Sequence, residues 1–228
     1  MTAKEQTRML YELHGSFPVL TKEELDLVVA NTFEISYKAG DIIFKEHSLT
    51  SHLLYIRDGL VKIVRENNNK QTIIVRIIPA NNFVGLMSLL GNRVYNFTAI
   101  AIEPTTILTI HNDTFNHVMI ANSGFSYNML QQLSQYGLEI INHLINIHQK
   151  LLPGRVADVL LFFMKLNNST EFSLPLTRKE MAEFAGTTKE SFIRALSEFK
   201  SDRIIELVEN KRVVIKSVEI LERLSRLG

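Results

Sequence analysis

One stretch of the chain repeats its apolar side chains at alternating intervals of four and three residues, the spacing of one face of an α-helix. Further apolar residues lie off this repeat, so the helix must be buried against two surfaces. We predict that it packs on its own chain and on a second copy, as the dimer helix of a homodimer; burial in its own chain only is the alternative. The repeat, called here the predicted seam, contains Met129, Leu133, Tyr136, Ile140, His143 and Ile147, and the residues off it are Leu130, Leu138, Ile141, Leu144 and Ile145.

Turn-forming residues bound this helix on both sides. Asn122-Ser123-Gly124 precedes it, and Leu152-Pro153-Gly154 should end it, because proline cannot donate a helical hydrogen bond. The chain is therefore predicted to have three parts. A β-domain with N-terminal helices covers residues 1–122, the long helix and a hinge cover 123–152, and a C-terminal domain covers 153–228.

Residues 33–110 have the pattern of short strands separated by turns. The turn-forming clusters are Gly40-Asp41, Asp58-Gly59 and Asn67-Asn68-Asn69, and β-branched residues are frequent between them. The pattern predicts an antiparallel sandwich or barrel.

Composition excludes several kinds of chemistry. The chain has no cysteine, which removes disulfides, thiol catalysis, cysteine zinc sites and the usual cysteine-held iron–sulfur cluster. Its 25 basic and 24 acidic side chains nearly balance, so bulk charge does not predict a nucleic-acid partner. No apolar run approaches the roughly 20 residues that span a bilayer, and the first residues lack the pattern of a signal peptide. We expect a cytoplasmic protein without a membrane partner.

The C-terminal part contains the pattern of two short helices joined by a glycine turn. Thr177 and Glu180 form a capping box that starts the first helix, and Gly186-Thr187-Thr188 forms the turn. Inward residues are expected at Met181, Phe184 and Ala185 in the first helix and at Phe192, Ala195, Leu196 and Phe199 in the second. The opposite side of the second helix, called here the outward stripe, contains Glu190, Ile193, Arg194 and Ser197.

The outward stripe has side chains suited to reading DNA bases. Arg194 can bind guanine with two hydrogen bonds, Glu190 can accept from the cytosine amino group, and Ile193 can touch a thymine methyl group. A hairpin tip after the second helix adds Lys211 and Arg212 for phosphate contacts. Two alternatives stay open, a capping box between Glu190 and Thr187 and a solvated ion pair of Arg194. Further polar residues at the helix start, where phosphates are attracted, are Thr187, Thr188, Lys189 and Ser191.

Four segments of the sequence resemble the Crp/Fnr transcriptional regulators over nearly the whole chain: KAGDIIF, LLYIRDGLVKI, PANNFVGLMSLL and LTRKEMAEFAGTTKESFIRAL. The resemblance implies an α+β protein with a β jelly-roll sensor domain, a dimerisation helix and a C-terminal winged helix-turn-helix. It places Lys189, Glu190 and Arg194 at base-reading positions and Arg178 and Thr188, beside Thr177, at backbone-contact positions. It also implies a homodimer on palindromic double-stranded DNA with a G-A step in each half-site, and RNA polymerase as a further partner.

The expected effector pocket departs from the pattern of the cyclic-AMP-binding members. Leu86 stands where they have a glutamate, and Tyr95-Asn96 falls where an arginine and a hydroxyl residue are expected, with Arg93 nearby. Burying an unpaired phosphate there would cost several kcal/mol, so cyclic AMP is not the expected ligand. A more apolar small-molecule effector, or none, fits better. The candidate pocket residues are Gly85, Leu86, Met87, Ser88, Tyr95, Asn96, Ile140 and Ile141.

The cofactor is left undecided by the sequence. Haem stays open because histidine and methionine can be axial ligands, and a haem-based gas or redox sensor of the same family is one alternative. The seven histidines show no metal-ligand spacing, so no metal site is predicted, and His143 is interpreted as a buried, hydrogen-bonded residue. The candidate axial ligands are His47, His52, His111, His117, His143, His148 and Met87.

Two other classes of protein are weighed against a DNA-binding regulator. One is a small-molecule-binding module that acts through protein contacts, in which the C-terminal helices are only structural. The other is a jelly-roll metalloenzyme, which would need clustered histidines on neighbouring strands; the β-region has no H-x-H pair. We therefore expect no enzyme activity.

Overall fold

The computed structural model describes residues 19–66, 72–209 and 211–227. These residues form two compact units. The first contains the described residues up to Ile63 and Ile77–Leu138, and the second contains those within Val64–Arg76 and from Glu139 onward. The boundary therefore cuts through the long helix, whereas the sequence predicts a new domain after it. The Asn67-Asn68-Asn69 turn and any helix before residue 19 lie outside the described residues.

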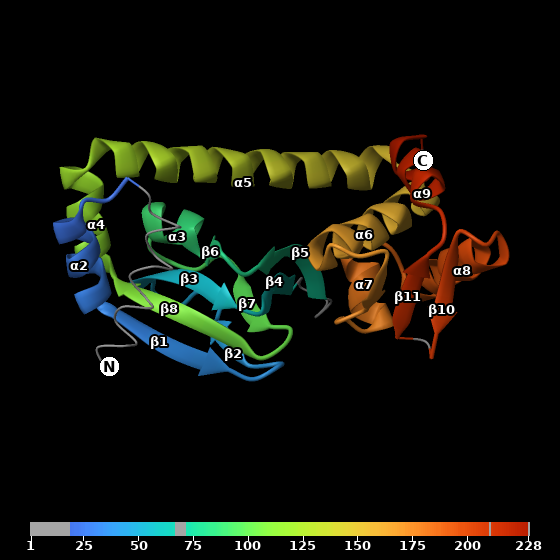
Figure 1. Ribbon diagram of the computed structural model, residues 1–228, viewed down its shortest axis with the longest axis horizontal. Coiled ribbons are helices and arrows are strands. Elements are labelled where there is room, and N and C mark those ends of the chain that lie inside the picture. The colour runs from blue at the N-terminus through green and yellow to red at the C-terminus, as the bar shows by residue number, and fades with distance from the viewer. Residues whose placement is uncertain (1–18, 67–71, 210, 228) are drawn as a thin grey trace. The chain divides into compact units, whose positions relative to one another are not determined.

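The β-domain consists of two four-stranded sheets, in the orders β1-β8-β3-β6 and β2-β7-β4-β5. The pairings of β1 with β8, β8 with β3, β3 with β6 and β2 with β7 are antiparallel (Figure 1). The predicted antiparallel β-domain is thus confirmed. The strands are β1 (Thr32–Tyr37), β2 (Ile42–Phe44), β3 (His52–Asp58), β4 (Leu60–Glu66), β5 (Thr72–Pro79), β6 (Asn82–Val84), β7 (Thr98–Ala101) and β8 (Thr105–His111).

The turn between β3 and β4 shows why the sequence has glycine there. Gly59 has a φ of 96°, in the left-handed region that other residues avoid. A Cβ atom at this position would lie 2.5 Å from the Thr105 hydroxyl oxygen and 2.7 Å from the Pro104 carbonyl oxygen. Only glycine allows the start of β8 to approach this closely.

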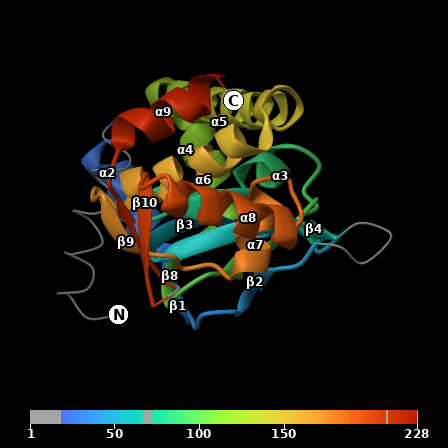
Figure 2. The same ribbon diagram turned by 90° about the vertical axis from the view of Figure 1, so that its right-hand side faces the viewer.

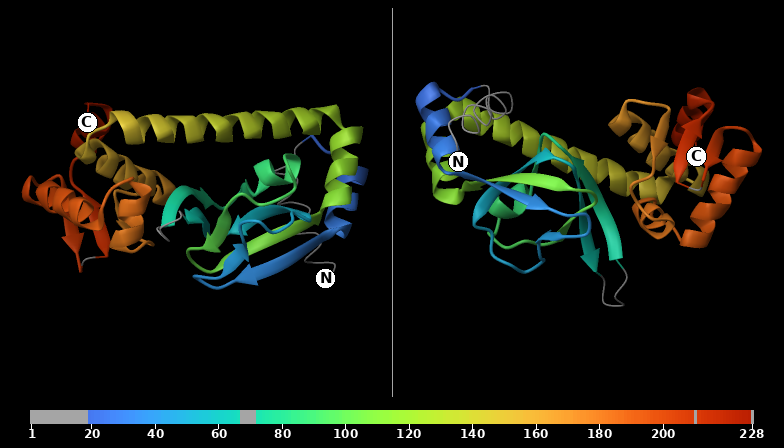
Figure 3. Two further views of the ribbon diagram at one scale, coloured as in Figure 1. Left: turned by 180° about the vertical axis from the view of Figure 1, so that it is seen from behind. Right: turned by 60° about the horizontal axis from the view of Figure 1, so that its bottom comes forward.

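Among the described residues, four helices accompany the β-domain: α2 (Lys22–Ala30), α3 (Leu86–Leu90), α4 (Asn112–Ala121) and the first part of α5 (Ser123–Gln149). Helices α2 and α4 lie beside each other in both views of Figure 3. One apolar core joins them to the strands, because Val28 of α2, Phe115 of α4 and Leu108 of β8 are buried in the same cluster. The start of α5 belongs to this core through Phe125 and Met129.

The break after the long helix differs from the sequence prediction. Helix α5 ends at Gln149, and α6 (Leu152–Asn167) begins at Leu152 with Pro153 in its first turn. Proline is well suited to the first turn of a helix because the N–H group that it lacks would have no helical partner there. Leu152-Pro153-Gly154 therefore starts a helix, and the break lies at the two preceding residues.

The second unit combines α6 with a three-stranded sheet and three more helices. The sheet has the order β10-β11-β9, and both pairings are antiparallel. Leu160 of α6, Phe192 of α8 and Leu221 of α9 are fully buried. The elements after α6 are β9 (Glu171–Ser173), α7 (Arg178–Phe184), α8 (Lys189–Ser201), β10 (Ile205–Val208), β11 (Arg212–Ile215) and α9 (Val218–Leu227). In the described part of the chain, no helix has the length and apolar character to cross a membrane.

Candidate DNA-reading surface and effector pocket

The capping box predicted for the first helix of the pair is present. The Thr177 hydroxyl accepts from the Glu180 backbone N–H at 3.3 Å, and the Glu180 carboxylate accepts from the Thr177 backbone N–H at 2.8 Å. Of the predicted inward residues, Met181 and Ala185 are buried and Phe184 is half-buried. The capping box thus fixes where α7 begins, and with it the direction in which the chain enters the turn.

The turn between α7 and α8 depends on Gly186, whose φ is 62°. A Cβ atom there would lie 3.3 Å from the Ile147 side chain. The Gly186 carbonyl oxygen accepts a hydrogen bond of 2.7 Å from Nη1 of Arg155 on α6. No local pattern in the sequence indicates a contact across 31 residues, so the role of Arg155 is visible only in the structure.

Helix α8 is held by its start and by its inward side. Thr188 is the N-cap, and its hydroxyl accepts from the Ser191 backbone N–H at 3.2 Å. The residue that caps α8 is therefore Thr188, whereas the alternative capping box required Thr187. The predicted inward stripe is confirmed, since Phe192, Ala195, Leu196 and Phe199 are all buried.

The outward stripe of α8 faces solvent. Glu190 and Arg194 are exposed, and the exposed fraction of Ile193 is 40%. Lys189 is exposed at the helix start, where the free backbone N–H groups attract anions. Figure 2 shows α7 and α8 beside each other at the front of the second unit. A cation, a carboxylate and an apolar side chain thus share one exposed face of a rigid helix.

Thr177 and Arg178, the two predicted contact residues at the start of α7, differ in how far they are exposed. Thr177 is exposed but engaged in the capping box. Arg178 is half-buried, and burial lowers the pKa of its guanidinium. Lysine and arginine side chains often bury their aliphatic part while the charged end stays near the surface.

The hairpin of β10 and β11 places its two predicted cations unequally. Lys211 is exposed at the turn. Arg212 pairs its guanidinium with the carboxylate of Glu171 on β9, so its charge is already compensated. Lys211 is therefore the stronger candidate for a phosphate contact. Asn210, between them and β10, lies outside the described residues.

The expected effector pocket is filled by two aromatic rings. The rings of Phe44 and Tyr95 stack with their centroids 3.7 Å apart and an angle of 9° between their planes. Gly85, with a φ of 77°, makes room for them, because a Cβ atom there would lie 2.7 Å from Cε1 of Tyr95. Burial, with a smaller effect of Tyr37, raises the pKa of Tyr95 to about 12, so its hydroxyl is neutral.

The other predicted pocket residues of the first unit are not all directed inward. Leu86 and Ser88 are buried, whereas Asn96 is exposed and Met87 is about half-exposed. Phe44 was missing from the prediction because it lies some forty positions before Gly85 in the sequence. Of the two residues predicted from α5, Ile140 is half-buried and Ile141 is exposed; both belong to the second unit.

The faces of α5 divide differently from the prediction. Met129 and Tyr136 of the predicted seam are buried in the core of the first unit, with Leu133 packed against it. Side chains buried in this core leave little surface for a second copy. A second repeat, with intervals of three and four residues, is exposed instead. This open seam contains Tyr127, Leu130, Ser134, Leu138, Ile141 and Ile145.

The end of the predicted seam, from His143 to Ile147, belongs to the second unit. The His143 ring stacks on Phe184 with centroids 5.6 Å apart, and the Ile147 side chain lies next to Gly186. Burial lowers the pKa of His143, against a smaller opposite effect of Asp158. The observed contact of His143 is thus aromatic packing. In the described part of the chain, no three histidine or carboxylate side chains lie together in a way that could hold a metal ion.

Two family models match the chain over the regions just described. The model of the cyclic nucleotide-binding domain matches residues 34–122, and that of the Crp-like helix-turn-helix domain matches residues 154–224. The chain belongs to the Crp/Fnr family of transcriptional regulators. The capped α7, the Gly186 turn and α8 are therefore a Crp-like helix-turn-helix, and the β-domain is a cyclic nucleotide-binding-type domain.

Relatives and solved structures of this family are distant in sequence and similar in fold. The chain is 23% identical over 209 residues to the Cyclic AMP receptor protein of Thermus thermophilus, covering 92% of this chain and 95% of that protein. It is 24% identical over 199 residues to the Global nitrogen regulator of a Nostoc species, covering 84% and 87%. The structure of FixK2 from Bradyrhizobium japonicum superposes with a TM-score of 0.76 at 17% identity, covering 85% and 96%.

The family fold implies a cyclic nucleotide, and the residues of this chain do not fit one. The side chain at position 86 is a buried leucine, which cannot bond a ribose hydroxyl. Tyr95 and Phe44 occupy the space next to Gly85 with neutral rings, so a phosphate there would meet apolar surface. A nucleotide would have to displace the stacked rings of Phe44 and Tyr95, and neither ring offers a positive charge to its phosphate.

Proposed function

We propose that this Crp/Fnr regulator binds double-stranded DNA as a homodimer and reads a palindromic site with α8. The observation that carries the proposal is the outward stripe, exposed on a helix whose other side is fully packed. Rigid support matters because a base-reading side chain must be held in register with a base edge. No catalytic step is part of this function.

In this proposal each outward residue has its own role. Arg194 bonds guanine, Glu190 accepts from cytosine, and Ile193 contacts a thymine methyl group. Phosphate contacts come from the starts of α7 and α8 and from the hairpin tip. These contacting residues are Thr177, Arg178, Thr187, Thr188, Lys189, Ser191 and Lys211, with Arg212 secondary because of its ion pair.

The dimer forms through the open seam of α5. Its exposed apolar residues repeat at the intervals that two packed helices require. Gly137 lies beside the seam, and a Cβ atom there would meet open space, which leaves room for a second helix. A two-fold dimer repeats the outward stripe at half-sites about one turn of DNA apart. As a transcriptional regulator, the dimer would have RNA polymerase as a further partner, in the compartment that holds the DNA.

The effector of the β-domain, in this proposal, is not cyclic AMP. The stacked rings of Phe44 and Tyr95 leave two possibilities for the β-domain. Either the rings hold the domain in a single conformation without a ligand, or an apolar molecule binds by displacing them. Titration with cyclic AMP should leave the melting temperature and DNA affinity unchanged. Saturable stabilisation by cyclic AMP would contradict this part.

Selection of bound sites from a random DNA pool tests the main proposal. We expect a palindrome with a G-A step and its complementary C in each half-site. The selected duplex and a scrambled duplex are then titrated at two salt concentrations, since phosphate contacts make DNA binding depend on salt. The absence of a palindrome, or equal affinity for both duplexes, would favour a module that acts only through protein contacts.

A further inference from the structure

The second unit contains a cavity outside both the DNA-reading surface and the β-domain. Its volume is about 170 Å³. His143 and Ile147 line it from α5, Arg155 and Phe162 from α6, and Phe184 from the end of α7. All five residues belong to the same compact unit. The residues of α5 that line it, His143 and Ile147, lie on the opposite face of the helix from the open seam.

The walls of this cavity are mainly apolar and aromatic. The Phe162 and Phe184 rings meet edge to face with centroids 5.4 Å apart, and the His143 ring stacks on Phe184. A protein cavity of about 150 Å³ with apolar walls accepts a benzene molecule. The volume here therefore suits a ligand with one aromatic ring or a branched chain of similar size.

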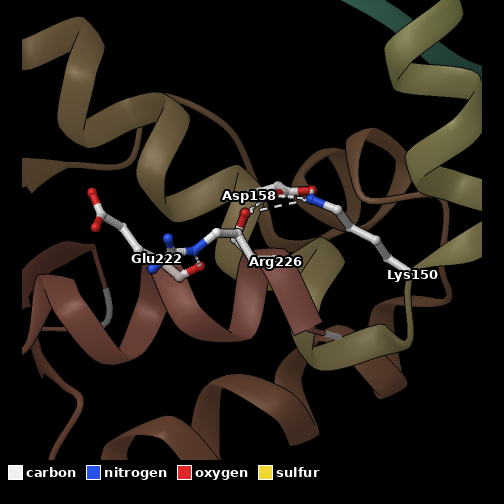
Figure 4. A network of polar contacts seen from close by, with 5 residues as sticks. Lys150, Asp158, Glu222 and Arg226 are labelled. Atoms are coloured by element: carbon white, nitrogen blue, oxygen red, sulfur yellow. Dashed lines mark hydrogen bonds and ion pairs between the residues drawn. The ribbon is translucent and has the colours of Figure 1, made fainter.

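The charges around the cavity are uneven. The Asp158 carboxylate is compensated, because Lys150 Nζ reaches its two oxygens at 2.8 and 2.7 Å and the Ser225 hydroxyl donates to it at 2.5 Å (Figure 4). Arg155 has no such partner, since no carboxylate of a described residue forms an ion pair with it. The lining thus carries one uncompensated positive charge beside apolar walls.

The guanidinium of Arg155 also has an N–H group without a hydrogen-bond partner among the described residues. Its Nη1 donates to the Gly186 carbonyl, whereas its Nε is buried and has no hydrogen-bond partner among the described residues. The edge formed by Nε and Nη2 matches the two oxygens of a carboxylate. Arg155 itself lines the cavity, and its hydrogen bond to the turn uses Nη1.

The geometry points to a binding site for a small carboxylate with one aromatic or branched apolar group, held by Arg155 and the rings of Phe162 and Phe184. The carboxylate pairs with the guanidinium, and the apolar group fills the cavity. The same guanidinium bonds the Gly186 carbonyl oxygen. A ligand that fixes the Arg155 side chain therefore also restricts the turn between α7 and α8. We infer that the ligand strengthens DNA binding; this consequence, but not the binding site, rests on the proposed function.

Benzoate is the probe, with benzyl alcohol and acetate as controls that lack the carboxylate or the ring. Calorimetric titration of the full chain should show saturable binding of benzoate, at least tenfold tighter than either control. Arg155→Lys keeps the positive charge but cannot form the bidentate pair with a carboxylate, so the affinity for benzoate should fall at least tenfold. Val159→Phe fills the cavity from a buried position and should abolish binding, while thermal unfolding checks that the variant is folded.

Two outcomes overturn the binding site: benzoate that binds no better than benzyl alcohol, or unchanged benzoate affinity in folded Val159→Phe. Titration of the selected DNA duplex with and without saturating benzoate tests the coupling. We expect several-fold tighter DNA binding with benzoate, and unchanged DNA affinity refutes the coupling. DNA binding without benzoate binding refutes the site and leaves the regulator intact. Benzoate binding without any DNA binding refutes the proposed function and leaves the site intact.

Discussion

The open seam of α5 predicts which substitutions separate the proposed dimer. Leu138 and Ile141 each have an exposed fraction of 53% in the single chain. Full burial of such a side chain contributes about 2 kcal/mol, so roughly 1 kcal/mol per side chain is left for the interface. A two-fold dimer contains each residue twice, and the double change Leu138→Ala with Ile141→Ala should therefore cost about 4 kcal/mol. This corresponds to a dissociation constant raised about a thousand-fold.

Sedimentation velocity over a range of protein concentrations measures this constant directly. Ile120→Ala is the matched control, because Ile120 is 87% exposed on α4 and lies on another helix. Met129→Ala is the opposite control. Its side chain is 1% exposed in the core of the first unit, so this change should lower the free energy of unfolding by about 2 to 5 kcal/mol.

Dimerisation of the double variant at wild-type affinity would contradict the open seam as the interface. A Met129→Ala variant that loses the dimer while it keeps its unfolding midpoint would contradict it equally. Either result would mean that the predicted seam, and not the open seam, faces the partner. Loss of dimer in the double variant alone supports the assignment.

Four further predictions concern the second unit. Arg194→Ala should cost about 1 to 3 kcal/mol of discrimination at one base pair in competition assays, and equal loss on every sequence would make it a phosphate contact. Lys211→Ala should weaken binding evenly and lower the salt slope by about one; Arg212→Ala should change the slope less, and the reverse order would contradict the ion-pair argument. Gly186→Ala should cost about 1 to 2 kcal/mol of stability in urea unfolding, because its φ is positive; an unchanged midpoint is the contrary result. The pKa of His143 is lowered from 6.5 by burial, so the unfolded chain binds the proton more readily. Stability should therefore decrease as pH falls below about 6.5, and His143→Gln should reduce this decrease in denaturation at two pH values.

Features that depend on short stretches of sequence were predictable. The capping box of Thr177 and Glu180, and the inward stripe from Phe192 to Phe199, involve residues three or four positions apart, and helix geometry fixes such contacts. The Asp58-Gly59 turn follows from local backbone preferences in the same way. Local periodicity therefore recovered most of the helix-turn-helix and the strand pattern of the β-domain.

Features that depend on distant residues were not predictable. Both apolar stripes of α5 have intervals of three and four, so their periodicity is equal, and only burial in one cluster with Leu108 of β8 and Phe115 of α4 shows which one is internal. The stack of Phe44 on Tyr95 and the bond from Arg155 to Gly186 join residues far apart in the sequence. Pro153 does not show by itself which helix it belongs to, because proline can end one helix or occupy the first turn of the next.

The position of Gly186 explains how a signal could reach the DNA-reading helix without changing the dimer. The turn contacts Ile147 on the inner side of α5 and Arg155 on α6, whereas the open seam lies on the outer side of α5. A molecule that braces Arg155 acts on the link between α7 and α8 and leaves the apolar residues of the open seam untouched. If the proposed dimer and the proposed ligand site are both right, affinity and assembly are controlled from opposite faces of α5, and substitutions on each face should affect the two measurements separately.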